Sequence, residues 1–450
     1  MPRFSALLLS KPRISQRRLR EAVLLSFCDP VLPQSFALMH LSRSQWRSLL
    51  PWLDISGLAL YFYDRLAQLN LMQWLPEEVE ARLLQNLADN TERTHSMLEE
   101  SIEVQSRFQK EGIGYLLLKG ISLAPHSVPR PELRSQLDLD FLIAADAIED
   151  ARRILEERDY VLHAVSGRSW EFKTRSPHIG SLRDLYKNHP ARSIELHVEA
   201  PLGAAGTRVA DGEWRNLCGC NMRVLAPVPL FLGQAAHLYK HVSSGFFRCS
   251  HLLELYRHIV ARREEAPFWA EVDEAVANNE RWALPLGVTT LLLTQVMGEF
   301  APETLSAYAD RLSVPVRLWT ERIGPRCVFA TWPGSKLHLL LQRELSAGNI
   351  ARQASLRRAL LPHRLPPPIA HAPARESLSA RMHRSWRQFS YILFRFRYHI
   401  VTGVQYAWEF ARWNRLKQRL GDQQNVTANR AGHSIHANDI SETNKGMTIL

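Results

Sequence analysis

The chain has 450 residues, a length typical of about two or three domain-sized units. Hydrophobic residues make up 46% of it and charged residues 22%, which excludes an intrinsically disordered chain and indicates a globular protein with a large apolar core. Its five scattered cysteines exclude a disulfide framework and favour a reducing compartment. No apolar run approaches the ~18 residues of a membrane-spanning helix, so we expect a cytoplasmic protein that is at most peripheral to a membrane.

Positive charge is concentrated in one segment of the chain. The net charge is +11, and residues 351–420 alone hold 14 lysines and arginines against two acids. Residues 1–350 hold 40 basic and 40 acidic residues and are neutral. Any binding to a polyanion is therefore expected within 351–420, and RNA or an anionic membrane surface are the candidate partners of that segment.

The hydrophobic pattern divides the chain into helical and mixed regions. Apolar residues recur at helical spacing on both sides of a middle region that contains short apolar runs typical of strands. We therefore predict an α+β fold, a small mixed β-sheet packed on helices, with N-terminal and C-terminal helical regions. The predicted parts are a basic N-terminal extension (1–20), a helical region (21–112), an α+β core (113–225), a helical domain (226–350), a basic linker with an amphipathic helix (351–420) and a disordered tail (421–450).

Particular residues mark the expected element boundaries. Pro76 and the acids after it predict a helix start, because proline suits the first turn and acids stabilise the positive end of the helix dipole. Gly112 predicts the end of the same helical pattern. The expected strands of the middle region cover residues 115–118, 137–143, 160–163, 170–174, 182–186 and 193–199.

Two of these strands carry acids on one face. Asp138 and Asp140 alternate with apolar residues over 138–143, so the two carboxylates share a face of the strand. Residues 194–199 also alternate between apolar and polar side chains, and Glu195 is the first acid on their polar face. If the strands are neighbours, the three carboxylates project together from the open face of the sheet. Such a cluster is typical of metal-assisted phosphoryl transfer, in which two divalent cations about 3.5–4 Å apart hold the phosphate and the attacking oxygen.

Candidate phosphate-binding groups precede these acids. The first expected strand ends in Lys119 and Gly120, where a glycine lets backbone N–H groups approach a phosphate closely, and Lys119 and Ser122 are further donors. Arg134, just before the aspartates, is an additional cation suited to phosphate.

The order of these motifs resembles the uncharacterised nucleotidyltransferase family, of the superfamily of DNA polymerase beta and the minimal bacterial nucleotidyltransferases. The resemblance covers residues 90–260 and is carried by Leu-Lys-Gly, an arginine, Asp-x-Asp and a later Glu-Leu-His strand. It implies that Asp138 and Asp140 are the paired metal-binding aspartates, Glu195 the third carboxylate and Gly120 the nucleotide-binding turn. The chain departs from the superfamily in having Lys-Gly in place of Gly-Ser or Gly-Gly, and in the 17 residues that separate this turn from the first aspartate.

The resemblance implies an enzyme that moves a nucleoside monophosphate from an NTP to an acceptor hydroxyl and releases pyrophosphate. Mg²⁺ or Mn²⁺ would be held by the three carboxylates, and residues 119–122 with Arg134 would steady the triphosphate. Glu195 or Asp140 would assist deprotonation of the acceptor. The sequence indicates neither the acceptor, nor the base, nor the oligomeric state. The alternative is a non-catalytic adaptor of the same fold that binds a polyanion or a membrane surface through its basic C-terminal segment.

The same residues also have structural interpretations. The aspartate pair is compatible with a solvated strand face, and Lys119 with the surface end of a buried strand. Glu195 is compatible with a surface acid, because Glu199 shares its face and can take its place. His197 is expected to be structural or to support a ligand rather than to be one.

Histidines follow the predicted sheet. The helices there carry residues that the family shares: His237, Lys240, His241, Arg248 and Glu254. His237 and His241 are four residues apart, a spacing that can bind zinc on a helix. Without an evident third ligand, packing or substrate contacts are the preferred interpretation of this pair. His251 and His258 carry no separate signal.

An amphipathic helix, or a pair of helices, is predicted over residues 384–418. Its apolar stripe contains Phe389, Ile392, Leu393, Phe396, Ile400 and Val404. Its arginines Arg384, Arg395, Arg397 and Arg412 gather on the other face. The stripe is compatible with capping the globular core, with lying on an anionic membrane surface and with presenting the arginines to RNA.

Overall fold

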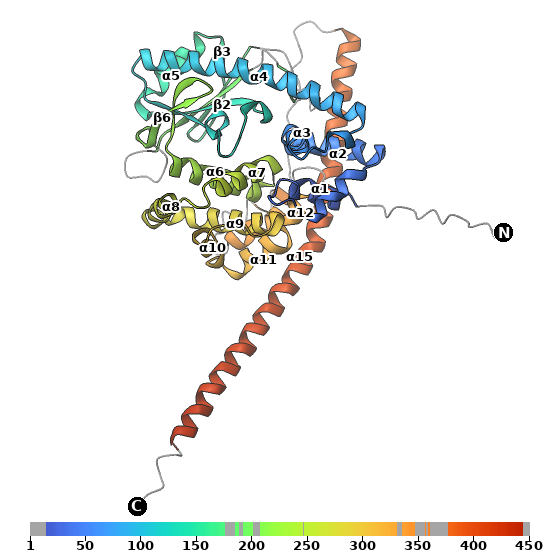
Figure 1. The fold of residues 1–450 in the computed structure, drawn as a ribbon, viewed down its shortest axis with the longest axis vertical. Coiled ribbons are helices and arrows are strands. Elements are labelled where there is room, and N and C mark those ends of the chain that lie inside the picture. The colour runs from blue at the N-terminus through green and yellow to red at the C-terminus, as the bar shows by residue number, and fades with distance from the viewer. Residues whose placement is uncertain are drawn as a thin grey trace, which may run out of the picture. The chain divides into compact units, whose positions relative to one another are not determined.

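The structure is a computed structural model of the chain (Figure 1). It describes residues 15–175, 185–188, 192–200, 208–245, 247–330, 335–346, 356, 359–360 and 377–443, with side chains as far as Arg419. The chain divides into two compact units, residues 1–334 and 335–450. The expected N-terminal extension lies outside the described residues as far as residue 14. The finer predicted division of the chain into six parts stays a prediction.

A mixed sheet forms the centre of the first unit, with the strand order β3-β4-β5-β2-β1-β7-β6. The strands are β1 (Tyr115–Leu118), β2 (Asp138–Ile143), β3 (Tyr160–Ser166), β4 (Ser169–Thr174), β5 (Ser193–Val198), β6 (Gly212–Leu217) and β7 (Cys220–Leu225). β2 pairs with β5, and β1 with β7, in parallel, whereas the other neighbours are antiparallel. The sheet confirms the predicted mixed α+β core.

Two details of the sheet differ from the predicted strands. The strand expected at 182–186 is not formed by Leu185 and Tyr186, and residues 182–184 lie outside the described part. The β6–β7 hairpin was not predicted, because β6 is an edge strand without a clear apolar alternation. Cys218 and Gly219 make its two-residue turn, and both have positive φ (53° and 82°), as tight hairpin turns require.

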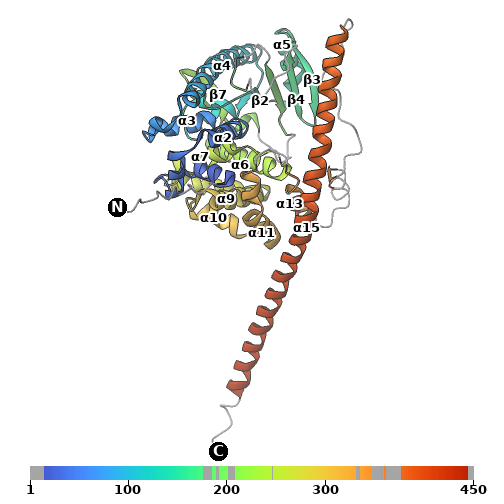
Figure 2. The ribbon, with the colours of Figure 1, turned by 90° about the vertical axis from the view of Figure 1, so that its right-hand side faces the viewer.

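Helices surround the sheet. Those of the first unit are α1 (Gln16–Leu25), α2 (Arg43–Ser56), α3 (Ala59–Gln68), α4 (Glu77–Lys110), α5 (Ile148–Glu156), α6 (Pro227–Ser244), α7 (Cys249–Ala261), α8 (Ala266–Asn278), α9 (Ala283–Met297), α10 (Glu303–Asp310), α11 (Val314–Arg322) and α12 (Gly324–Val328). α4 begins after Pro76 and ends before Gly112, whose φ is 68°, as predicted. In both views α4 lies along one side of the sheet, and α6 and α7 lie on the other (Figures 1 and 2).

The apolar face of the sheet forms the core with α4 and α5. Leu139, Phe141 and Ile143 of β2 are at most 1% exposed and pack in one cluster with the apolar side chains of both helices. Ile194 and Leu196 of β5 belong to the same cluster. Because side chains alternate along a strand, this packing turns the acids of β2 and β5 to the opposite face, which looks toward α6 and α7.

The second unit contains α13 (His338–Leu345) and one long helix, α15 (Leu378–Thr443, 66 residues). The two helices are joined by Glu344, which accepts hydrogen bonds from Trp413 Nε1 (2.9 Å) and Lys417 Nζ (2.8 Å). Within the part of the chain that the structure describes, no helix is both long and apolar enough to cross a bilayer.

In the structure α15 continues through residues 421–443, which were predicted as part of a disordered tail, and ends at Thr443. Residues 421–443 contain no proline and only Gly421 and Gly432 as glycines, so nothing in the sequence breaks a helix that is already formed, although each glycine costs about 1 kcal/mol relative to alanine. The apolar stripe predicted on this helix is exposed: Phe389 is 56%, Phe396 63% and Val404 67% accessible. The stripe therefore does not cap the core of its own unit.

Candidate functional site

The register between β2 and β5 brings acids of the two strands together. Asp140 lies directly opposite Glu195, and Asp138 opposite Ser193. Carboxylate oxygens of Asp140 and Glu195 and a ring nitrogen of His197 lie within 4.8 Å of one another. Asp140 is only 3% exposed and Asp138 is half-buried, so the two aspartates of β2 do not lie on a fully solvated strand face.

Hydrogen bonds hold the acids in place. Asp140 Oδ1 accepts one from Lys119 Nζ (3.0 Å) and lies 3.0 Å from His197 Nε2. His197 Nε2 is also 3.6 Å from Glu195 Oε2, and the Ser169 hydroxyl donates a short hydrogen bond to Glu195 Oε1. Lys119 therefore pairs with an acid of the cluster rather than ending a strand at the surface, and His197 links the two carboxylates.

The two aspartates of β2 have pKa values shifted in opposite directions. Burial, together with the negative charge of Asp140, raises the pKa of Asp138 to about 6. Burial by itself would also raise the pKa of Asp140, but the hydrogen bond from His197 and the charge of Lys119 outweigh it and hold that pKa below its usual range. The negative charge of Asp140 is therefore stabilised by its neighbours Lys119 and His197, whereas that of Asp138 is stabilised poorly.

The turn after β1 has an unusual backbone. Lys119 and Gly120 have φ of 52° and 54°, a region that residues with a side chain rarely adopt. A Cβ at Gly120 would overlap the side-chain amide of Gln136, which would have to move, and the positive φ further favours glycine there. Ser122 is fully buried, and its hydroxyl donates to the Lys119 carbonyl (2.8 Å). Ser122 therefore stabilises the turn from inside.

A cavity of about 360 Å³ lies between the acidic face of the sheet and helices α6 and α7. Asp138, Asp140 and Lys119 line its sheet side, and its helix side includes His237 and Arg248. Of the predicted residues, Arg134 also lines the cavity, whereas Gly120, Ser122 and Glu195 do not. Glu199 lies apart from the acids: its carboxylate accepts the Val209 N–H (3.1 Å).

Arg134 is held by a buried network. Its Nε donates to Glu254 Oε1 (3.1 Å), which also accepts the Tyr61 hydroxyl (3.1 Å). Burial would lower the pKa of Arg134, but the charge of Glu254 outweighs it and raises that pKa. The amide of Asn90, a fully buried residue of α4, donates to the carbonyls of Glu132 (2.6 Å) and Arg134 (3.1 Å). These hydrogen bonds from α4 therefore hold in place the segment that leads into β2.

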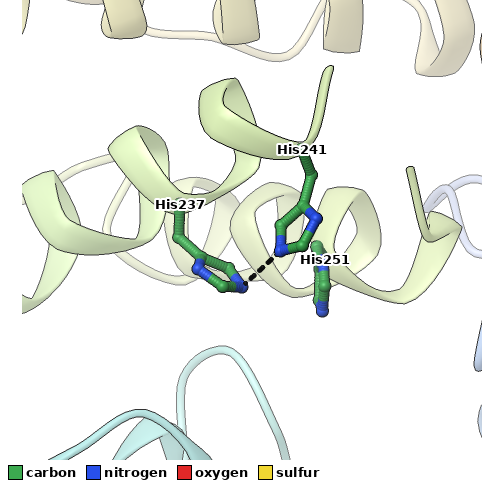
Figure 3. Close-up of side chains that lie close together, drawn as sticks. All are labelled: His237, His241 and His251. Carbon is green, nitrogen blue, oxygen red and sulfur yellow. Dashed lines mark hydrogen bonds between the residues drawn. The ribbon is translucent and has the colours of Figure 1, made fainter. Parts of the chain in front are cut away.

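Three histidines gather on the helix side of the cavity (Figure 3). His237 and His241 come from α6 and His251 from the first turn of α7, and each offers a ring nitrogen within 4.8 Å of the other two. Burial lowers the pKa of His237 to about 2 and that of His251 well below its usual range, so both rings are neutral at physiological pH.

Several residues of the site were not predicted. His251 carried no signal because the turn between α6 and α7, which brings it to the other histidines, is not visible as a spacing in the sequence. Gln136 donates to the Asp138 carbonyl (2.7 Å), and Ser169 donates to Glu195. Asn90 lies within a long helical pattern, where polar residues on the buried face, among them Arg93, Ser101 and Gln105, were the available sign of tertiary hydrogen bonds.

Two solved structures are similar to part of the chain. The antibiotic-resistance factor ANT(2'')-Ia aligns with 42% of this chain and 97% of its own, at 9% identity and a TM-score of 0.30. An antigenic nucleotidyltransferase-like protein from Paracoccidioides brasiliensis aligns with 41% of this chain and 88% of its own, at 14% identity and a TM-score of 0.25. At such low scores neither similarity supports an argument about this site.

No curated protein matches the chain. The family model described as uncharacterised nucleotidyltransferase matches residues 42–298. This range includes the whole sheet, the acids of β2 and β5, and helices α6 and α7. Because the match extends over more than half of the 450 residues, the chain belongs to the uncharacterised nucleotidyltransferase family.

Proposed function

We propose that the protein is a metal-dependent nucleotidyltransferase that moves a nucleoside monophosphate from an NTP to an acceptor hydroxyl and releases pyrophosphate. The observation that carries the proposal is the parallel register of β2 and β5, which sets Asp140 beside Glu195 with Asp138 one strand repeat away on the same face. The cavity on that face is large enough for a small-molecule ligand.

The carboxylates fit a hard divalent cation such as Mg²⁺ or Mn²⁺. Their oxygens are the ligands these ions prefer. Burial and the charge of Asp140 raise the pKa of Asp138, so the negative charge of this carboxylate would be stabilised by a bound cation. Asp138, Asp140 and Glu195 would hold the ion or ions. When bound, such ions neutralise the charge on the transferred phosphoryl group and on the leaving pyrophosphate.

The other residues would position substrates. Lys119 would exchange its contact with Asp140 for one with the triphosphate, and Arg134, fixed by Glu254, would present its guanidinium in the cavity. Gly120 would let the turn approach the phosphates, and Ser122 would keep the turn in shape. Glu195 or Asp140 would accept the proton of the acceptor hydroxyl.

A second candidate is a non-catalytic protein of this fold that binds a polyanion or membrane surface through residues 351–420. The observation that favours it is the exposed aromatic and aliphatic stripe of α15, on a helix whose other face carries arginines. This candidate requires no nucleotide in the cavity.

Calorimetric titration with Mg²⁺ and an NTP that cannot be cleaved between its α- and β-phosphates separates the two candidates. The four bases are tested in turn on the full chain, on the double variant Asp138→Asn with Asp140→Asn, and on Asp146→Asn as a matched control, because Asp146 is exposed and follows the same strand. The proposal expects binding to the wild type and the control, and loss in the double variant. If no nucleotide binds, or if the double variant binds like the wild type, the proposal is wrong.

A further inference from the structure

The histidines of α6 and α7 form a cluster that the proposed transfer reaction does not need. His237 and His241 lie one helical turn apart on the same face of α6, so their side chains point the same way. The chain then reverses through Gly245, whose φ of 78° is left-handed, and α7 places His251 against them. The three ring centroids are 4.4, 4.8 and 4.9 Å apart, and Figure 3 shows the three rings side by side, with the hydrogen bond between His237 and His241.

We propose that His237, His241 and His251 bind one transition-metal ion of the zinc class, and that the fourth position of this ion faces the cavity. The site is separate from the carboxylates of β2 and β5 and does not depend on nucleotide transfer. Imidazole nitrogens suit zinc and its neighbours, whereas carboxylate oxygens suit Mg²⁺ and Mn²⁺. The cavity would therefore have two cation sites of different chemical preference on its two sides.

The spacing of the rings fits tetrahedral coordination. His237 Nε2 and His241 Nε2 are 3.1 Å apart. Two nitrogens bound to zinc at ~2.0–2.1 Å on adjacent corners of a tetrahedron are about 3.3 Å apart. A shift of a few tenths of an ångström would thus turn the contact between the two rings into coordination of a shared ion. Three protein ligands and one open position are typical of zinc sites that act on a ligand rather than only hold a fold.

Packing alone does not explain the cluster well. Both the His237 and the His251 rings are neutral through burial, so their nitrogens are available as ligands. The Nδ1 of His251 is buried and has no hydrogen-bond partner, and an unsatisfied buried nitrogen costs about 1–3 kcal/mol. Three imidazole rings in contact, one with a buried nitrogen that lacks a hydrogen bond, stabilise a helix interface less than apolar side chains would.

The formal charges around the cavity balance, although the charged groups that act on the histidines most strongly, Lys119, Arg134 and Arg248, are positive and, in addition to burial, lower the pKa values of His237 and His251. The ionisable lining of the cavity, apart from the histidines, consists of Lys119, Arg134, Arg248, Asp138, Asp140 and Glu254. These are three positive and three negative groups, so the formal balance is neutral.

Metal content of the full-length chain tests the proposal. The protein is stripped with a chelator, loaded with Zn²⁺ and dialysed, and zinc is measured by mass spectrometry; a parallel titration with Co²⁺ follows the visible absorption of a tetrahedral site. The variants are His237→Gln and His241→Gln, with His251→Gln in reserve should one of them not fold by circular dichroism. The matched control is His163→Gln, since His163 is exposed on β3, and His197→Gln reports on the carboxylate cluster.

The proposal expects one zinc ion per chain and a tetrahedral cobalt spectrum, both retained in His163→Gln and His197→Gln. Each cluster variant should lower the affinity for zinc at least about 10-fold, because removing even a residue that only hydrogen-bonds to a metal ligand has an effect of this size. Zinc that fails to bind, or that binds equally in the cluster variants, overturns the site. So does zinc lost in His197→Gln but kept in His237→Gln. Zinc retained when nucleotide fails to bind would overturn the proposed function alone.

Discussion

At the scale of single residues, two aspartates on one strand face have opposite environments. Asp140 is paired with Lys119 and lies against His197, whereas Asp138 is half-buried without a comparable partner and has a pKa raised to about 6. A charge buried beside another charge is tolerated in a folded protein when a ligand compensates it. The contrast suggests that Asp138 is the residue whose ionised form gains most from a bound cation.

The first prediction follows from this contrast. Because the folded-state pKa of Asp138 is raised from 3.8 to about 6, the unfolded chain loses this proton first, and stability falls as the pH rises from about 4 to about 6 and stays reduced above that range. At pH 8, with a chelator present to remove metal ions, Asp138→Asn should therefore raise the free energy of unfolding by about 1–3 kcal/mol. Below about pH 4 the same substitution should have little effect. Asp140→Asn should lower it by about 1–3 kcal/mol, because Lys119 loses its partner. Urea unfolding of both variants at the two pH values measures the difference, and equal effects of the two changes would contradict it.

At the scale of elements, α4 connects the sheet to the loop that carries Arg134. Its 34 residues span about 51 Å, enough for Met97 and Phe108 to pack in the sheet core while Asn90 bonds the carbonyls of the loop. The helix thus sets the position of Arg134 relative to β2 by two independent contacts.

The second prediction tests this role of α4. Asn90→Ala removes both hydrogen bonds to the loop and should lower the free energy of unfolding by about 1–3 kcal/mol, and it should also weaken NTP binding because Arg134 loses its fixed place. The matched control is Gln85→Ala on the exposed side of α4, for which a change within about 0.5 kcal/mol is expected. Urea unfolding and NTP titration measure both effects. If Asn90→Ala loses stability but binds NTP normally, α4 does not position Arg134.

The elements also show what the sequence can predict. Period-2 alternation predicted that Asp138, Asp140 and Glu195 share a face, since burial of Leu139 and Ile194 leaves no other orientation. It could not predict that the Ser122 hydroxyl turns inward, because that follows from the backbone of the 119–120 turn. Nor could it predict His251, whose place depends on how α6 and α7 pack.

At the scale of the whole molecule, the candidate site and the strongly basic segment lie in different units of the chain. The family match and all candidate site residues lie within the unit of residues 1–334, and the strongly basic segment lies within residues 335–450. Arginines beside an exposed apolar stripe bind anionic surfaces by electrostatic attraction, which salt weakens.

The third prediction uses this separation. A chain ending at residue 334 should bind Mg²⁺ and NTP as the full chain does, and should lose any affinity for RNA or anionic vesicles. The full chain should bind one of these two partners with an affinity that falls steeply between low and physiological salt. Loss of NTP binding in a folded shortened chain would show that the second unit completes the nucleotide site.

The central claim is that the acids of β2 and β5 hold the metal and the nucleotide together. Anomalous scattering from Mn²⁺ in crystals of the full chain, grown with an NTP analogue that cannot be cleaved at its α-phosphate, tests it most directly. The account predicts a manganese peak within about 2.0–2.3 Å of carboxylate oxygens of Asp138, Asp140 and Glu195, with the triphosphate beside Lys119. Manganese and nucleotide bound away from these three carboxylates, or a nucleotide-free cavity at saturating analogue, would contradict it.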